Sequence, residues 1–155
     1  MTDPRIMMPG HIHESNLIAG ESDPTRDRQG AVCWLELCRY KTLTVDAIKE
    51  CQRATTVWQG LPDRYRGQYR DVSVKYGCDP ELIQRRMENW LFDMLQWKKC
   101  DPKEMHILFE KIHPFFDGNG RVGRLLFWWH QRRRGIQPTI IVDAHKEWDY
   151  YYWWK

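Results

Sequence analysis

The stretch His-Pro-Phe-Phe-Asp-Gly-Asn-Gly-Arg-Val-Gly-Arg, residues 113–124, most constrains the fold, because it places a polar, glycine-rich turn between two segments of helical periodicity. Apolar residues recur at the spacing of one helical face on both sides of the turn: Met105, Leu108, Phe109 and Ile112 before it, and Val122, Leu125, Leu126 and Trp129 after it. We therefore expect a helix, a tight turn and a second helix. The alternative is a turn between two strands, which Asp-Gly and Asn-Gly pairs also favour, but the flanking periodicity argues against it.

The residue types in this turn favour the binding of phosphate. Gly118 and Gly120 allow positive φ and let backbone N–H groups approach a ligand, while the following helix directs its positive N-terminus to the same place. Arg121 and Arg124 lie three residues apart, so both can flank one anion. Asp117 is a suitable ligand for Mg²⁺, which binds through few carboxylates together with water and substrate phosphates.

At every fixed position, residues 113–124 match the signature of the Fic (filamentation induced by cAMP) family, His-x-Phe-x-Asp/Glu-Gly-Asn-Gly-Arg-x-x-Arg. The chain is therefore similar to Fic domains, and the resemblance implies an all-α, Fic-type helical bundle with a small β-hairpin flap over the active site. Residues 1–155 would form a single domain of this kind. The implied activity is that of a protein adenylyltransferase, which moves AMP from ATP to a Ser, Thr or Tyr hydroxyl of a target protein and depends on Mg²⁺.

The resemblance also implies a role for each signature position. His113 would be the general base that takes the proton of the attacking hydroxyl, Phe115 would anchor the loop, and Asp117 would bind the metal. The nucleotide-binding residues would be the turn and the two arginines: Gly118, Asn119, Gly120, Arg121 and Arg124.

Residues 13–21 resemble the family's inhibitory helix, which carries Ser/Thr-x-x-x-Glu-Gly/Asn; the three fixed positions are Ser15, Ala19 and Gly20. In the family the glutamate pairs with the second arginine of the signature, here Arg124, and blocks seating of the γ-phosphate. Ala19 cannot make this pair. We therefore expect a constitutively active enzyme unless an inhibitor protein acts in trans. Glu21 is a displaced candidate, but two residues further on it would face another side of a helix.

A second segment resembles the family's target-binding flap. Residues 69–76 alternate as in a strand, and a Gly-x-Tyr-Arg-x-x-x-Val pattern is formed by Gly67, Tyr69, Arg70 and Val74. We expect a β-hairpin flap over residues 68–76, against which the target protein adds a strand. The alternative is a solvent-facing hairpin that packs on the bundle.

The rest of the chain gives further helical signals. We expect helices over residues 30–40 and 44–58, one that starts at Asp79-Pro80, one that starts at Asp101-Pro102 and stops at Pro114, and one from Gly120 to Gly135. Residues 1–12 are expected to be an extended lead-in, with a short helix after Pro9-Gly10 as the alternative, and residues 21–29 a loop with Pro24 as helix breaker. Residues 138–142 are expected to be a short strand or an extended segment, followed by a helix from Asp143 through Trp148.

Composition excludes little. The net charge of +3 does not require nucleic acid or a membrane as partner, and no apolar run approaches the roughly 18 residues of a membrane span. Five cysteines without a Cys-x-x-Cys pair favour a reducing, cytoplasmic location. The aromatic tail, residues 150–154, lies where the family has its adenine pocket; self-association through this tail is the competing interpretation.

Two alternative functions stay open. The first is a Fic-like phosphotransferase, in which the nucleotide lies reversed; such relatives carry Ala and Lys where this chain has Gly118 and Gly120. The second is a catalytically silent binding module that holds a partner with the flap and the aromatic tail.

Overall fold

The structure, a computed structural model, describes residues 4–96 and 98–154, so positions 1–3, 97 and 155 of the expected domain lie outside it. The α-helices of the described part are α1 (Pro4–Ile18), α2 (Pro24–Arg39), α3 (Val45–Thr55), α4 (Pro80–Leu95), α5 (Pro102–Ile112) and α6 (Asn119–Arg133). Short helical turns complete it: η1 (Asp63–Tyr65), η2 (Asp143–His145), η3 (Lys146–Tyr150) and η4 (Tyr151–Trp154). The expected all-α class is confirmed, and within the described residues none of the helices is both long and apolar enough to cross a membrane.

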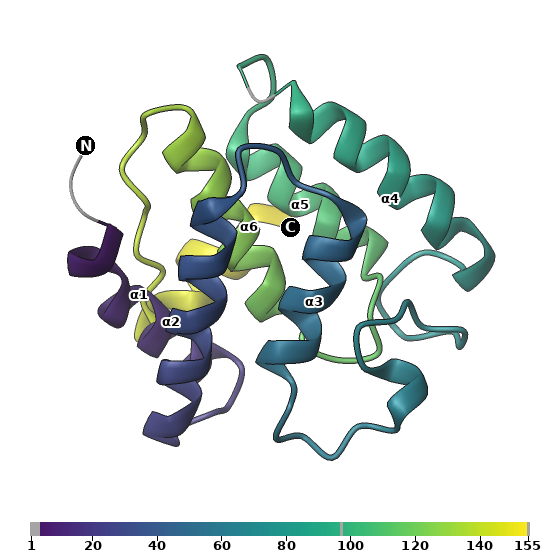
Figure 1. Cartoon of the computed structure of the whole chain (residues 1–155), viewed down its shortest axis with the longest axis horizontal. Helices are drawn as coiled ribbons and strands as arrows, with labels where there is room; N and C mark the ends of the chain where they lie inside the picture. The colour runs from purple at the N-terminus through teal and green to yellow at the C-terminus, as the bar shows by residue number, and fades with distance from the viewer. Residues whose placement is uncertain (1–3, 97, 155) are drawn as a thin grey trace.

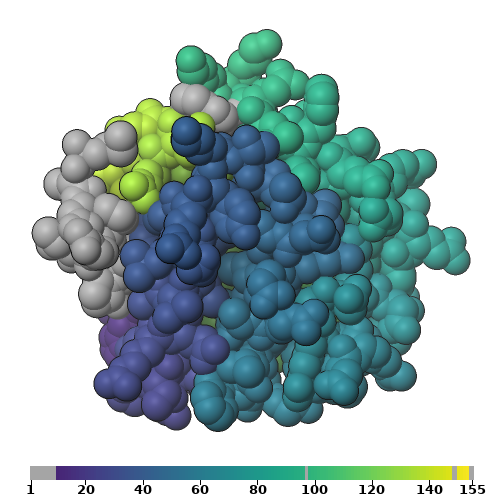
Figure 2. Space-filling model, viewed as in Figure 1, coloured from purple at the N-terminus to yellow at the C-terminus, as the bar shows by residue number. Residues whose placement is uncertain are grey.

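Helix α6 forms the centre of the bundle (Figure 1). It packs against α5, α3, α2 and α1, and every residue from Arg121 to Gln131 is buried. A helix that is buried on all sides belongs to the core rather than to the surface. In the space-filling view α2 and α3 lie side by side over it and form much of the near surface (Figure 2). The signature turn at the N-terminus of α6 is therefore held from several directions.

The helix starts follow from local capping. Thr44 Oγ1 accepts a hydrogen bond from the Ala47 amide (3.1 Å), and Asp101 accepts from the amides of Lys103 and Glu104 (2.9 and 3.1 Å). These caps confirm the predicted starts of α3 and α5. Helix α3 ends at Thr55, three residues before the predicted end at Trp58.

The expectation of a loop over residues 21–29 is wrong from Pro24 onward, because this proline begins α2 instead of breaking it. Asp23 caps the helix by accepting from the Thr25 amide (2.9 Å), and the missing N–H of a proline is harmless in the first turn. The extended lead-in is wrong from Pro4 onward, because α1 begins there and includes the residues after Pro9-Gly10, where a short helix was the alternative.

Residues 138–142 do not form a strand; of the two expected forms, the extended segment without regular secondary structure fits them. This segment instead lies along α6, where the Thr139 amide donates to Gln131 Oε1 (2.9 Å) and the Thr139 carbonyl accepts from Trp128 Nε1 (2.8 Å). Side chains of α6 thus replace a partner strand. The helix expected from Asp143 is present only as the short turns η2 and η3.

The β-hairpin expected over residues 68–76 is also wrong: residues 4–96 and 98–154 contain no strand. The reason is Arg70, whose side chain is not directed to solvent but is buried (2% exposed). Its amide donates to the Pro114 carbonyl (2.9 Å), and its guanidinium donates to four further carbonyls, those of Val72 (2.7 Å), Cys78 (2.5 Å), Ile112 (3.4 Å) and His113 (2.7 Å). The segment is therefore bound to the signature loop rather than paired with itself.

Replacement of Arg70 should destabilise the fold. Arg70→Ala leaves four carbonyls without their charged donor, and we expect the free energy of unfolding to fall by about 2–4 kcal/mol in urea denaturation. Arg85→Ala is the matched control, because Arg85 is exposed on α4, and it should change stability by less than about 0.5 kcal/mol. Equal effects of the two substitutions would show that the carbonyl contacts do not stabilise the protein.

Candidate active site

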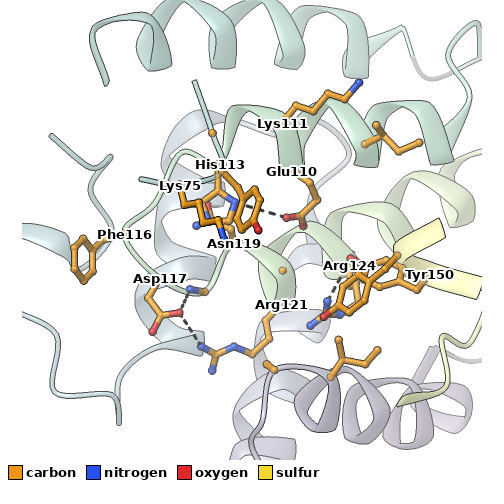
Figure 3. A pocket seen from close by; sticks show the side chains of 18 of the residues that line it. Lys75, Glu110, Lys111, His113, Phe116, Asp117, Asn119, Arg121, Arg124 and Tyr150 are labelled. Atoms are coloured by element: carbon orange, nitrogen blue, oxygen red, sulfur yellow. Dashed lines mark hydrogen bonds and ion pairs between the residues drawn. The ribbon is translucent and has the colours of Figure 1, made fainter. Parts of the chain in front are cut away.

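The turn between α5 and α6 lines a cavity of about 980 Å³ (Figure 3). Signature residues from His113 to Arg124 form one wall, residues 75–77 form another, and Ala19 at the end of α1 and Tyr150 of η3 complete it. A cavity of several hundred cubic ångströms is the size that a nucleotide-sized ligand needs.

Two side chains and one unusual backbone conformation shape the turn. His113 ends α5 in the left-handed region (φ 50°, ψ 62°), which histidine adopts more readily than most residues. Phe115 is fully buried, and Asn119 closes the turn: Asn119 Oδ1 accepts from the Phe115 amide (2.9 Å) and Nδ2 donates to the Phe115 carbonyl (2.8 Å). The Asn119 side chain is thus used for loop geometry, and only its backbone is available to an anion.

Gly118 is needed where α6 begins. It has φ 82°, and a Cβ atom there would lie 2.6 Å from Thr56 Cγ2 of the neighbouring segment. The turn therefore fits closely against the end of α3, and the first amides of α6 stay open to the cavity as a helix N-terminus that attracts anions.

Asp117 and Arg121 lie together at the mouth of this turn. Asp117 Oδ1 accepts from the Gly118 amide (2.6 Å) and is 3.9 Å from Arg121 Nη2. Arg121 is held by α3 and the turn after it, since it donates to the Thr55 carbonyl (2.9 Å) and to Gln59 Oε1 (2.8 Å). The Asp117 side chain is half exposed (49%), so its other oxygen can face a ligand, and a single carboxylate beside a phosphate site fits Mg²⁺.

Arg124 is buried and contacts α1 and η3. Its Nε donates to Ser15 Oγ (2.8 Å), its Nη2 to the Ser15 carbonyl (2.9 Å) and its Nη1 to Tyr150 Oη (3.3 Å). Residues 13–21 therefore do contact the second signature arginine, and they do so through neutral oxygens of Ser15.

Ala19 lines the cavity, and Gly20 follows it with φ 79°. Glu21 does not replace the absent glutamate, because its carboxylate accepts from Gln59 (3.1 Å) and lies 3.5 Å from Arg26 Nε rather than meeting Arg124. No carboxylate of the 13–21 segment thus reaches Arg124.

His113 has the electrostatic properties of a base. Its side chain is 30% exposed and lines the cavity. Burial, and then the neighbouring Arg70 guanidinium, lower the pKa of His113, although a hydrogen bond to the Glu110 backbone opposes this shift. The imidazole is therefore neutral at pH 7 and can accept a proton.

The flap residues named from the sequence divide into two groups. Gly67 and Arg70 are buried, and the Gly67 amide donates to Gln52 Oε1 (2.6 Å). Tyr69 and Val74 are half-buried, and the Tyr69 ring lies 5.8 Å from that of Phe115. The side chains that border the cavity from this segment are instead Lys75 and Tyr76.

Sequence reasoning missed one residue of the site, Glu110, and the contact between Tyr150 and Arg124. Glu110 lies one helical turn before His113 and lines the cavity, a spacing that could have indicated it. Tyr150 lies far from Arg124 in sequence, and no local signal predicts their contact, whereas the family resemblance placed residues 13–21 beside Arg124. Among the tail aromatics, Tyr150 and Tyr151 line the cavity, whereas the side chain of Trp154 lies outside the described residues.

A glycine turn at a helix N-terminus, with two arginines, a carboxylate and a neutral histidine around one cavity, defines a candidate nucleotide site in a helical bundle. The model of the Fic/DOC family matches residues 42–130, more than half of the chain. The chain therefore belongs to the Fic/DOC family.

Similar proteins agree with this assignment. A protein adenylyltransferase Fic of Drosophila grimshawi is 33% identical over 100 residues, which are 57% of this chain and 20% of that protein, and protein adenylyltransferase fic-1 of Caenorhabditis briggsae is 28% identical over 92% of this chain and 29% of that protein. The chain thus spans less than a third of the length of these relatives. A Fic-domain protein structure from Bacteroides thetaiotaomicron shares the fold, with a TM-score of 0.73 and 19% identity over 92% of this chain and 69% of that one.

The close fit at Gly118 can be tested against Gly135, which has φ 70° but open space around it. Gly135→Ala should lower the free energy of unfolding by about 1–2 kcal/mol, through backbone strain alone. Gly118→Ala adds the contact with Thr56, so we expect a loss of about 2–4 kcal/mol and weaker ATP binding. Thermal unfolding and calorimetric titration with ATP measure both; equal losses and unchanged ATP affinity would contradict the close fit.

Proposed function

We propose that this chain is a protein adenylyltransferase, which transfers AMP from ATP to a Ser, Thr or Tyr hydroxyl of a target protein. The observation that carries the proposal is the convergence of His113, Asp117, Arg121 and Arg124 on one cavity at the N-terminus of α6. The relatives named as protein adenylyltransferases support the same reaction.

In this reaction the hydroxyl oxygen of the target attacks the α-phosphorus of ATP, and its proton passes to His113. The bond between the α-phosphorus and the oxygen that bridges to the β-phosphate breaks, so that pyrophosphate leaves. A lowered pKa keeps His113 in the neutral form that accepts the proton.

The remaining residues stabilise the phosphates. The amides of Asn119 and Gly120 at the N-terminus of α6 would bind phosphate oxygens, with Gly118 giving the turn its shape, and Arg121 and Arg124 would add positive charge. Asp117 would hold Mg²⁺, which supplies positive charge against the phosphate oxygens when bound. Tyr151 is half-buried beside Tyr150, with ring centroids 5.4 Å apart, and it would contact the adenine ring of ATP.

The target protein would pass along residues 68–76, which border the cavity beside His113. Tyr76 is 69% exposed there and Lys75 is exposed as well. This segment forms no strand in the free protein, so a target that docks by backbone pairing would order it as a strand on binding.

The role of His113 is tested by His113→Ala. We expect transfer to fall by 10²-fold or more, on the order of the contribution of a general base, while ATP and Mg²⁺ binding stay near the wild-type values. Labelled ATP with a cell lysate or with the protein itself, followed by mass spectrometry, measures transfer. The exposed His145 provides the control variant His145→Ala, which should label at the wild-type rate. Wild-type labelling by the His113 variant would exclude it as the base.

The absence of an inhibitory carboxylate is tested by Ala19→Glu. Arg124 now donates to neutral oxygens of Ser15, and a charge-assisted pair would add about 1.5–3 kcal/mol, so we expect labelling with ATP to fall tenfold or more. Ala19→Gln is the matched control, because it adds the same volume without the charge and should inhibit much less. An inhibitor protein in trans would act on the same arginine. Unchanged labelling in Ala19→Glu would show that residue 19 does not reach Arg124.

A further inference from the structure

Glu110 holds a carboxylate inside the bundle beside the proposed base. It lies on α5 one turn before His113, its side chain is 14% exposed, and it lines the cavity (Figure 3). Glu110 Oε2 is 4.0 Å from His113 Nδ1. Gly123 of α6 makes the space, because a Cβ atom there would overlap Glu110 Oε1.

This carboxylate is not explained by a structural ion pair. Glu110 Oε1 is buried and has no hydrogen-bond partner among the residues that the structure describes. The nearest nitrogen to it in an ion-pair geometry is His106 Nε2, at 3.9 Å, and that nitrogen is already bonded to Tyr150 Oη (2.7 Å). Burial lowers the pKa of His106 to about 3, so this ring is neutral. A buried acceptor without a partner is costly, and such groups gather at functional sites.

The charged and titratable groups that face Glu110 come from three elements. Helix α5 and its end contribute His106 and His113. Helix α6 contributes the cationic Arg124, and η3 contributes the neutral Tyr150. Burial raises the pKa of Glu110 to about 7, and Arg124 opposes this rise. The carboxylate therefore changes its charge near neutral pH.

We propose that Glu110 is a positioning residue for His113. The backbone of Glu110 directs the His113 ring, and the Glu110 carboxylate supports the proton transfer. The backbone of Glu110 hydrogen-bonds to the His113 ring, and Glu110 Oε2 lies on the Nδ1 side of that ring, so we assign the acceptance of the target hydroxyl's proton to Nε2. The proton moves from that hydroxyl to Nε2, and the carboxylate at 4.0 Å from Nδ1 stabilises the imidazolium that results. The inference rests on the proposed function, because it concerns the base of that reaction.

The direction in which the transfer rate changes with pH follows from the charge of Glu110. Well above pH 7 Glu110 is ionised and supports His113; as the pH falls through about 7 it is protonated and the support is lost. Glu110→Gln keeps the shape and the backbone contact but resembles the protonated form at every pH. Its rate should therefore match that of the wild type on the acid side and fall below it on the alkaline side.

The test compares the full-length wild type, Glu110→Gln and the control Glu104→Gln, which removes an exposed carboxylate from the same helix. On the alkaline side of pH 7 we expect kcat for labelling in Glu110→Gln to be on the order of tenfold lower, with an unchanged KM for ATP and no step in rate near pH 7. Glu104→Gln should keep the wild-type profile. A wild-type profile in Glu110→Gln would overturn the proposal.

A second measurement separates this inference from the proposed function. The NMR signals of the His113 ring, followed against pH without nucleotide, should show a step near pH 7 that Glu110→Gln abolishes and Glu104→Gln retains. If the protein transfers no AMP and the step is present, the coupling of Glu110 to His113 holds and the proposed function fails. If the step is absent from the wild type, the carboxylate does not act on His113, whatever the activity.

Discussion

The two hydrogen bonds between the Asn119 side chain and the Phe115 backbone are the contact on which the site depends. They close the turn over a fully buried phenyl ring, so the loop is attached to the core rather than to the surface. With the turn closed, α6 begins at a defined residue and its first amides point to the cavity. His113 lies at the other end of the same turn, where its left-handed backbone ends α5, and its side chain lines the same cavity. One closed loop therefore determines the distance between the base and the phosphate-binding helix end.

The two signature arginines are held by different parts of the chain. Arg121 is bound to the end of α3 through the Thr55 carbonyl, whereas Arg124 is bound to α1 through Ser15. The candidate anion site is thus assembled from α1, α3 and α6. Helix α1 contacts Arg124 directly, whereas the segment after α1 reaches Arg121 only through Gln59, which also donates to Glu21.

The sequence predicted those parts of the fold whose signals are local. Asp101 followed by Pro102 starts α5, and the glycine turn joins it to α6, because caps and turns depend on neighbouring residues alone. The flap failed for the opposite reason: its alternation is real, but Arg70 turns inward to carbonyls up to 43 positions away, which no local pattern shows. Likewise Arg124 meets Ser15 across 109 positions, so the family resemblance indicated this contact and periodicity could not.

The strength of the hydrogen bonds from Arg124 decides how firmly this arginine is bound to α1. The bonds from Arg124 to Ser15 and Tyr150 go to neutral oxygens, and a phosphate is a stronger acceptor for a guanidinium than either of them. A nucleotide phosphate could therefore replace Ser15 as the acceptor for Arg124 more readily than it could replace a glutamate at position 19. The proposed phosphate contact and the contact between α1 and α6 thus compete for one arginine.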